Sequence, residues 1–150
     1  MIAPNIQKWI QEAMKAKDET RLSTLRLLAS ALSYEKIAQQ RDLTEVEELG
    51  VVKREAKKRE DAIEAYIQVG APERADQEKK ELRILKSFLP PEMSDVELRK
   101  VVEETITSMG VLKPNDMGRV IGAVKAKVGV AADGAKIAQM VKVRLSTPEP

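Results

Sequence analysis

The stretch ELRILKSFLPPEMSDVEL, residues 81–98, decides how this chain of 150 residues is divided. Its apolar residues recur at helical spacing up to the prolines. Pro90 and Pro91 then stop the helix, because proline disfavours the helical conformation of the residue before it. Ser94 and Glu97 have the spacing of a capping box, which starts a new helix. The stretch therefore predicts a domain boundary between two helical regions.

Helical periodicity continues on both sides of this boundary. It predicts four helices before the prolines and three after them. Long helices with short connections favour antiparallel neighbours. We predict an all-α protein with an N-terminal four-helix hairpin or bundle domain at residues 1–89 and a small, basic C-terminal three-helix domain at residues 90–150. A single continuous bundle is the alternative.

The composition excludes several classes of function. The chain has no cysteine and no histidine, which removes thiolate nucleophiles, the usual zinc sites and the commonest general base. It also has no phosphate-binding loop, no dinucleotide fingerprint and no zinc-protease motif. We therefore predict no catalytic residue, no metal site and no cofactor. No apolar stretch approaches the ~20 residues that span a bilayer, and we expect a soluble, cytoplasmic protein that does not bind membranes.

Residues 111–147 stand out by their charge. Seven bases and two acids give this segment +5, whereas the whole chain has +2. Such a surplus is typical of contact with an anionic partner. The candidate RNA-binding residues are Lys113, Arg119, Lys125, Lys127, Lys136, Lys142 and Arg144. Helical phasing points the last three in different directions, so the sequence indicates a basic module and does not indicate a single patch.

Glycines mark one side of the helix predicted within this segment. At ~100° per residue, its core stripe is predicted to be Met117, Ile121, Val124 and Val128. The adjoining strip holds Gly118, Gly122, Lys125 and Gly129. Without side chains, this strip lets another backbone approach closely. It is either packed tightly against a neighbouring helix or forms a flat surface for an RNA backbone beside Lys125.

Two further features each have two interpretations. Asp133 and Gly134 form an ordinary helix N-cap, and the free amides there could also hold a phosphate. The charge run at residues 53–61 stacks like charges at i,i+4, which a phosphate contact would explain. However, Glu55 lies four residues before Arg59, so a solvated, self-neutralised face is the simpler interpretation.

Several segments together resemble the YqeY family, also called the GatB/YqeY family. They are MKAKDETRLSTLRLLASAL (14–32), KKREDAIEAYIQVG (57–70), ELRILKSFLPPEMSDVEL (81–98), NDMGRVIGAVKAKV (115–128) and ADGAKIAQMVKVRL (132–145). The sharpest elements are FLP at 88–90, DMG at 116–118 and ADG at 132–134. The family's motifs imply binding or packing roles for Asp116, Met117, Gly118, Gly122, Ala132, Asp133, Gly134 and Lys136.

The resemblance implies the same two-domain helical architecture. It also implies kinship with the tail of the B subunit of the tRNA-dependent amidotransferase, a carbon–nitrogen ligase with glutamine as amido donor. That tail contributes to tRNA binding, while the catalytic chemistry resides elsewhere in the enzyme. The leading hypothesis is a non-catalytic accessory protein that binds tRNA or another structured RNA. The alternative is a helical protein–protein adaptor. A ligase acting alone has no support from the residues.

Overall fold

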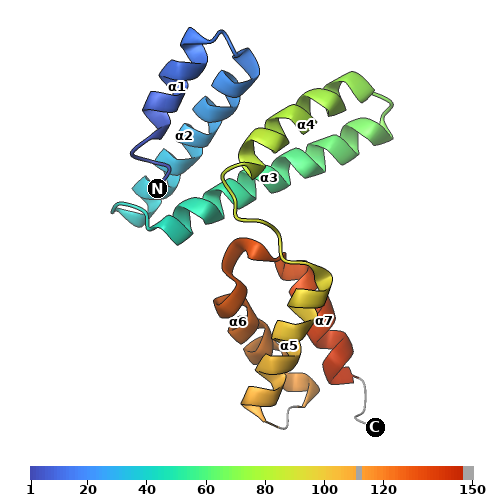
Figure 1. Cartoon of the computed structure of the whole chain (residues 1–150). Coiled ribbons are helices and arrows are strands. Elements are labelled where there is room, and N and C mark those ends of the chain that lie inside the picture. The colour runs from blue at the N-terminus through green and yellow to red at the C-terminus, as the bar shows by residue number, and fades with distance from the viewer. Residues whose placement is uncertain (111–112, 147–150) are drawn as a thin grey trace. The chain divides into compact units, whose positions relative to one another are not determined.

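The computed structural model describes residues 1–110 and 113–146 (Figure 1). Within these ranges the regular structure is entirely helical, which confirms the predicted all-α class. The helices are α1 (Ile6–Lys15), α2 (Glu19–Gln39), α3 (Glu45–Gln68), α4 (Pro72–Lys86), α5 (Asp95–Met109), α6 (Met117–Val128) and α7 (Gly134–Ser146). Contacts between residues divide the chain into two compact units, Met1–Pro90 and Pro91–Pro150. Each unit is described below by itself.

Side-chain caps fix where two of the helices begin. The backbone N–H of Glu47 donates to Thr44 Oγ1 at 3.3 Å, and the Thr44 N–H donates to the Glu47 carboxylate at 2.8 Å. Ser94 and Glu97 form the same reciprocal pair at 3.2 and 2.9 Å. Both predicted capping boxes are therefore complete, and each satisfies amides that the first helical turn leaves free.

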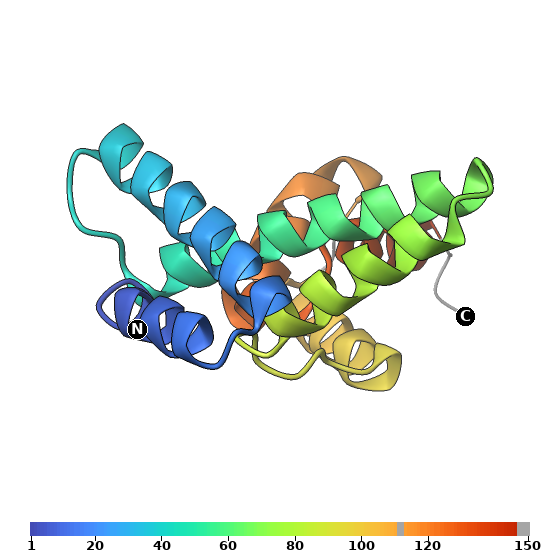
Figure 2. The same ribbon diagram turned by 90° about the horizontal axis from the view of Figure 1, so that it is seen from above.

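The first unit consists of two helical hairpins, α1–α2 and α3–α4 (Figures 1 and 2). They share one apolar core, with Leu25 and Val52 fully buried and Leu85 only 1% exposed. The rings of Trp9 and Phe88 stack with centroids 5.3 Å apart, which ties α1 to the segment after α4. Apolar residues from all four helices thus close this core.

A partly buried charge cluster joins α3 to α4. Arg59 Nε lies 3.0 Å from Glu81 and 3.6 Å from Glu78, and all three side chains are at most 20% exposed. Within the charge run, Lys58 pairs with Glu55 at 2.8 Å and Lys57 pairs with Asp61 at 3.2 Å, as expected of a self-neutralised face, whereas Arg59 does not pair with Glu55. Burial, together with the neighbouring Glu81 carboxylate, raises the pKa of Glu78. Arg59 therefore links two helices.

The second unit packs α5, α6 and α7 around its own core. Val120 and Val124 of α6 are fully buried, whereas Met117 and Ile121 are only partly buried. Of the predicted stripe, Val124 and Val128 are thus buried, while Val120 takes the buried position that was expected of Met117 and Ile121. Because α6 contacts both α5 and α7, its buried face is set by two neighbours that sequence phasing does not place. No helix in residues 1–110 and 113–146 is long and apolar enough to span a bilayer.

Candidate nucleic-acid interface

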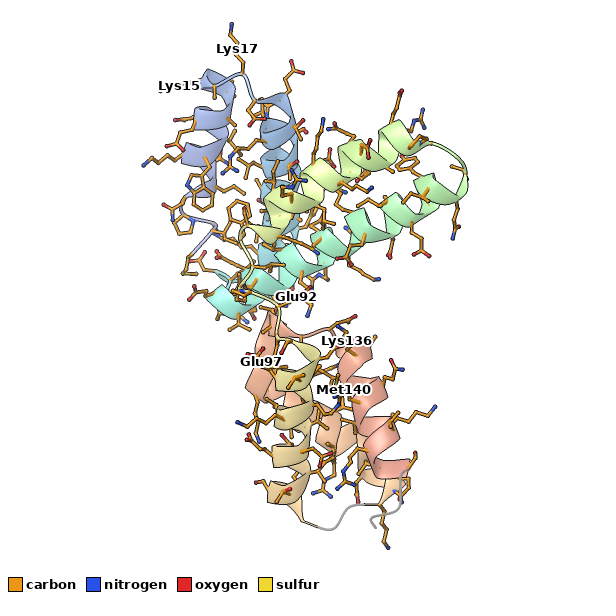
Figure 3. All side chains as sticks on the ribbon, turned by 45° about the vertical axis from the view of Figure 1, so that its right-hand side comes forward. Lys15, Lys17, Glu92, Glu97, Lys136 and Met140 are labelled. Atoms are coloured by element: carbon orange, nitrogen blue, oxygen red, sulfur yellow. The ribbon has the colours of Figure 1, made fainter. Side chains whose placement is uncertain are left out.

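Three of the seven candidate bases are held by carboxylates. Arg119 lies 3.4 Å from Asp116 on its own helical turn. The other two pairs reach α5: Lys136 lies 2.8 Å from Asp95, and Arg144 lies 2.8 Å from Glu103. Lys136, labelled in Figure 3, lies in the first turn of α7.

The Asp95–Lys136 pair affects the titration of both partners. Their side-chain hydrogen bond raises the pKa of Lys136 and lowers the pKa of Asp95. Asp95 and Glu103 were not predicted as partners, because the charge balance was considered for residues 111–147 alone. Counted over residues 91–150, nine bases face eight acids, which gives a net charge of +1. The C-terminal domain as a whole is therefore much less basic than residues 111–147 alone, because α5 supplies compensating acids.

The other four bases lie on three different segments of the second unit. Lys127 Nζ donates to Thr105 Oγ1 of α5 at 3.0 Å in a partly buried contact. The side chains of Lys113, Lys125 and Lys142 are exposed on different elements. Lys113 precedes a 3₁₀ turn, Lys125 lies on α6 and Lys142 lies on α7. Within the described residues, Lys113, Lys125 and Lys142 are thus left exposed and without the carboxylate contacts found for Arg119, Lys136 and Arg144.

The glycine strip of α6 is open. Gly118 and Gly122 are exposed, and a Cβ built on either one meets no atom within 4 Å. The prediction that this strip packs tightly against a neighbouring helix is therefore wrong for the residues that the structure describes. Gly129 also has open space around it, and its φ of +55° ends α6 in a conformation that favours glycine.

Lys125 extends from this strip to the start of α7. A Cβ built on Gly134 would lie 3.3 Å from Lys125 Cε and 3.4 Å from its Nζ. Asp133 Oδ1 accepts a hydrogen bond from the Ala135 N–H at 3.1 Å, so the predicted cap is present. We call the surface formed by the exposed Gly118, Gly122 and Lys125 and the half-buried Gly134 the glycine face. It combines one ammonium group, two positions without side chains and the first turn of a helix.

This surface has the chemistry of a binding site. Among the residues that the structure describes, no three Asp or Glu side chains lie close enough to hold a metal ion, and the sequence has no His or Cys. Lys125 can donate hydrogen bonds and neutralise an anion, while the glycines let a partner approach the backbone.

Comparison with known proteins agrees with the whole-chain resemblance. The family model for Yqey-like proteins matches residues 3–145. An uncharacterised protein of Schizosaccharomyces pombe is 29% identical over 97 residues, which cover 62% of this chain and 79% of that protein. The Altered inheritance of mitochondria protein 41, mitochondrial, of Lachancea thermotolerans is 29% identical over 114 residues, covering 74% of this chain and 61% of that protein. Since the family model covers nearly the entire sequence, the chain belongs to the YqeY-like family.

Proposed function

We propose that the chain is a cytoplasmic, non-catalytic accessory protein that binds structured RNA, with tRNA as the first candidate, through the glycine face. One observation carries the proposal: Gly118 and Gly122 are uncovered on the same side of α6 as a lysine that reaches the start of α7. Any amidotransferase chemistry would need a separate catalytic subunit, as the family resemblance implies.

Electrostatics favours an anion at this place. The first turn of a helix carries partial positive charge, so the helix does not stabilise the ammonium group of a lysine beside it. Because the Asp133 carboxylate already caps the start of α7, Lys125 is the group that would attract an anion placed there. A phosphate of an RNA backbone meets this requirement, and the missing side chains at Gly118 and Gly122 leave room for the adjoining sugar. Recognition by shape and phosphate contacts is the usual mode for structured RNA.

The charge balance of the second unit sets how strongly RNA binding should depend on salt. With a net charge of +1 and only a few exposed lysines, binding should neutralise about two phosphates and have a shallow salt dependence, with a slope of roughly −2 in log K against log salt. Affinity would then depend on shape as well as on charge.

Two variants separate the contribution of shape to RNA binding from the contribution of charge. Fluorescence anisotropy with labelled total tRNA should show at least tenfold weaker binding for Gly122→Leu, because the new side chain blocks the approach. The variant should fold at least as well as the parent, because no atom lies within 4 Å of the new Cβ and glycine in a helix costs about 1 kcal/mol. Lys125→Glu should also weaken binding, whereas Lys100→Glu on α5 is the matched control.

Unchanged tRNA affinity in folded Gly122→Leu and Lys125→Glu would refute the proposal. The adaptor function makes a different prediction for the same variants. A partner helix seated on the glycine face would be lost in Gly122→Leu but retained after nuclease treatment and at high salt.

A further inference from the structure

Five basic side chains of the first unit have no carboxylate partner. Among the residues that the structure describes, no Asp or Glu oxygen lies within 4.0 Å of their charged groups. All five lie in α1, in α2 or in the turn between them: Lys8, Lys15, Lys17, Arg21 and Arg26. Bases of α3 and α4 differ, since Arg54, Arg59 and Lys86 each pair with a carboxylate. Unpaired cations therefore gather in the α1–α2 hairpin.

The net charge of the first unit is divided in the same way. Residues 1–41 hold seven bases and four acids, which gives +3, whereas residues 42–90 hold ten bases and twelve acids, which gives −2. Two of the four acids, Asp18 and Glu19, lie at the start of α2. Asp18 accepts a hydrogen bond from the Arg21 N–H at 3.1 Å, and carboxylates at a helix start are stabilised by its partial positive charge. The α1–α2 hairpin is thus the positive part of this unit.

Three of the unpaired bases are brought close to one another at one end of this hairpin. Arg26 Nη2 lies 3.9 Å from Met14 Sδ, which places the Arg26 guanidinium beside the last turn of α1. Lys15 follows Met14 in that turn, and Lys17 lies in the connection to α2 (Figure 3). All three basic side chains are exposed. We call the surface formed by Lys15, Lys17 and Arg26 the basic end.

The backbone at Lys17 adds a second observation. Its φ is +55°, in the left-handed region that favours glycine. The chain therefore carries a lysine where a glycine would be less strained, and Figure 3 shows that this side chain points away from both helices. Strained positions of this kind are common at functional sites.

We propose that the basic end contacts the phosphate backbone of the structured RNA that the chain binds, an inference that rests on the proposed function. Lysine and arginine side chains without carboxylate partners neutralise phosphates and release their counterions. A lipid surface suits the basic end less well. The apolar residues of α1, Ile6, Ile10 and Ala13, are buried in the core, so α1 has no free apolar face to enter a bilayer.

The basic end should change how strongly RNA binding depends on salt. Each lysine or arginine that contacts a phosphate contributes about 1 to the slope of log K against log salt. The slope of roughly −2 expected for the glycine face alone should therefore steepen to about −4 or −5 for the whole chain. Because both contacts belong to one chain, the second contact also raises the affinity for a single RNA.

Fluorescence anisotropy with labelled total tRNA tests the proposal. Lys15→Gln/Lys17→Gly should weaken binding about tenfold or more at low salt and make the salt slope shallower by roughly 2. Lys79→Gln/Lys80→Gln on α4 is the matched control, because it removes two positive charges from the same unit outside the basic end. The control should change the affinity by less than about twofold.

Lys17→Gly alone separates RNA binding from folding. Glycine adopts a positive φ without strain, so the Tm of this variant should equal or exceed that of the parent. Its affinity for tRNA should nevertheless fall, because the ammonium group is lost. A stable Lys17→Gly variant with parental tRNA affinity would count against the contact.

The same titrations distinguish the basic end from the glycine face. If Gly122→Leu weakens tRNA binding and the folded Lys15→Gln/Lys17→Gly variant behaves like its control, the basic end is overturned and the glycine face stands. The reverse result supports the basic end and refutes the glycine face, and a parent that does not bind tRNA overturns both. Vesicles with roughly 30% phosphatidylserine should not bind the parent. Vesicle binding that is lost in Lys15→Gln/Lys17→Gly, with unchanged tRNA binding, would assign the basic end to a lipid surface and overturn the RNA contact.

Discussion

The buried carboxylate of Glu48 provides the most direct test of how the first unit is closed. Its side chain is 0% exposed. Its two oxygens accept hydrogen bonds from the backbone N–H groups of Ile2 at 2.7 Å and Ala3 at 3.0 Å. We predict that Glu48→Gln strongly destabilises this unit although the two side chains have nearly the same shape.

The magnitude follows from these two bonds. Glutamine keeps one acceptor oxygen and replaces the other with an NH₂ donor, so one backbone amide loses its partner and meets another donor. A hydrogen bond to a charged group contributes about 1.5–3 kcal/mol, and Glu48→Gln should cost about 2–3 kcal/mol. Glu48→Ala loses both bonds and leaves a cavity, so it should cost about 4–6 kcal/mol. In a unit of this size, the glutamine variant should lower Tm by on the order of 10 °C.

Urea denaturation followed by Trp9 fluorescence measures the effect in the right place. Trp9 is the single tryptophan of the chain and stacks on Phe88 in the first unit. Glu45→Gln, at an exposed position in the first turn of α3, is the matched control and should change stability by less than about 0.5 kcal/mol. Amide exchange at Ile2 and Ala3 should accelerate in Glu48→Gln alone. A Glu48→Gln variant as stable as the control, with unchanged exchange, would refute the reasoning.

Other predictions concern the remaining buried groups and one cap. Glu81→Gln should cost about 1.5–3 kcal/mol in urea denaturation, because it weakens the contact with Arg59. The pKa of Glu78 is raised above its ordinary 4.5, so the stability that its protonated form contributes is present below that value and is lost as pH rises through the folded-state pKa. Glu78→Gln should therefore be more stable than the parent at about pH 7, and the difference in stability should vanish below about pH 4. Thr44→Ala should cost about 1 kcal/mol by removing an N-cap, measured by the same denaturation. Val124→Ala should cost about 2–3 kcal/mol by circular dichroism while Trp9 fluorescence reports an unchanged first unit.

Local signals in the sequence were sufficient to predict the helical class and two of the helix starts. The capping boxes at Thr44 and Ser94 are satisfied by residues three positions away, so their partners are visible in the sequence. The same holds for the Asp133 cap. Features that depend only on near neighbours along the chain were therefore predicted correctly.

Features that depend on a distant partner were not predicted. Arg59 was expected to pair within α3, but the packing of α4 brings Glu81 closer in a less exposed position. The charge surplus at residues 111–147 was read without α5, whose Asp95 and Glu103 bind two of its bases. Whether the glycine strip was covered also depended on helix placement, which phasing alone does not give. The sequence was therefore sufficient to list the basic candidate residues, but the carboxylates that neutralise some of them became visible only in the structure.

The two apolar cores have no residue in common: the residues packed in the first end at Leu89, and those packed in the second begin at Met93. A unit that completes its own apolar core can fold and evolve as an independent domain. During synthesis the first unit can finish folding while the second is still being translated. Over longer times, either unit could be joined to a different chain without repacking the other. A small helical unit of this kind can therefore be combined with different neighbours in different chains.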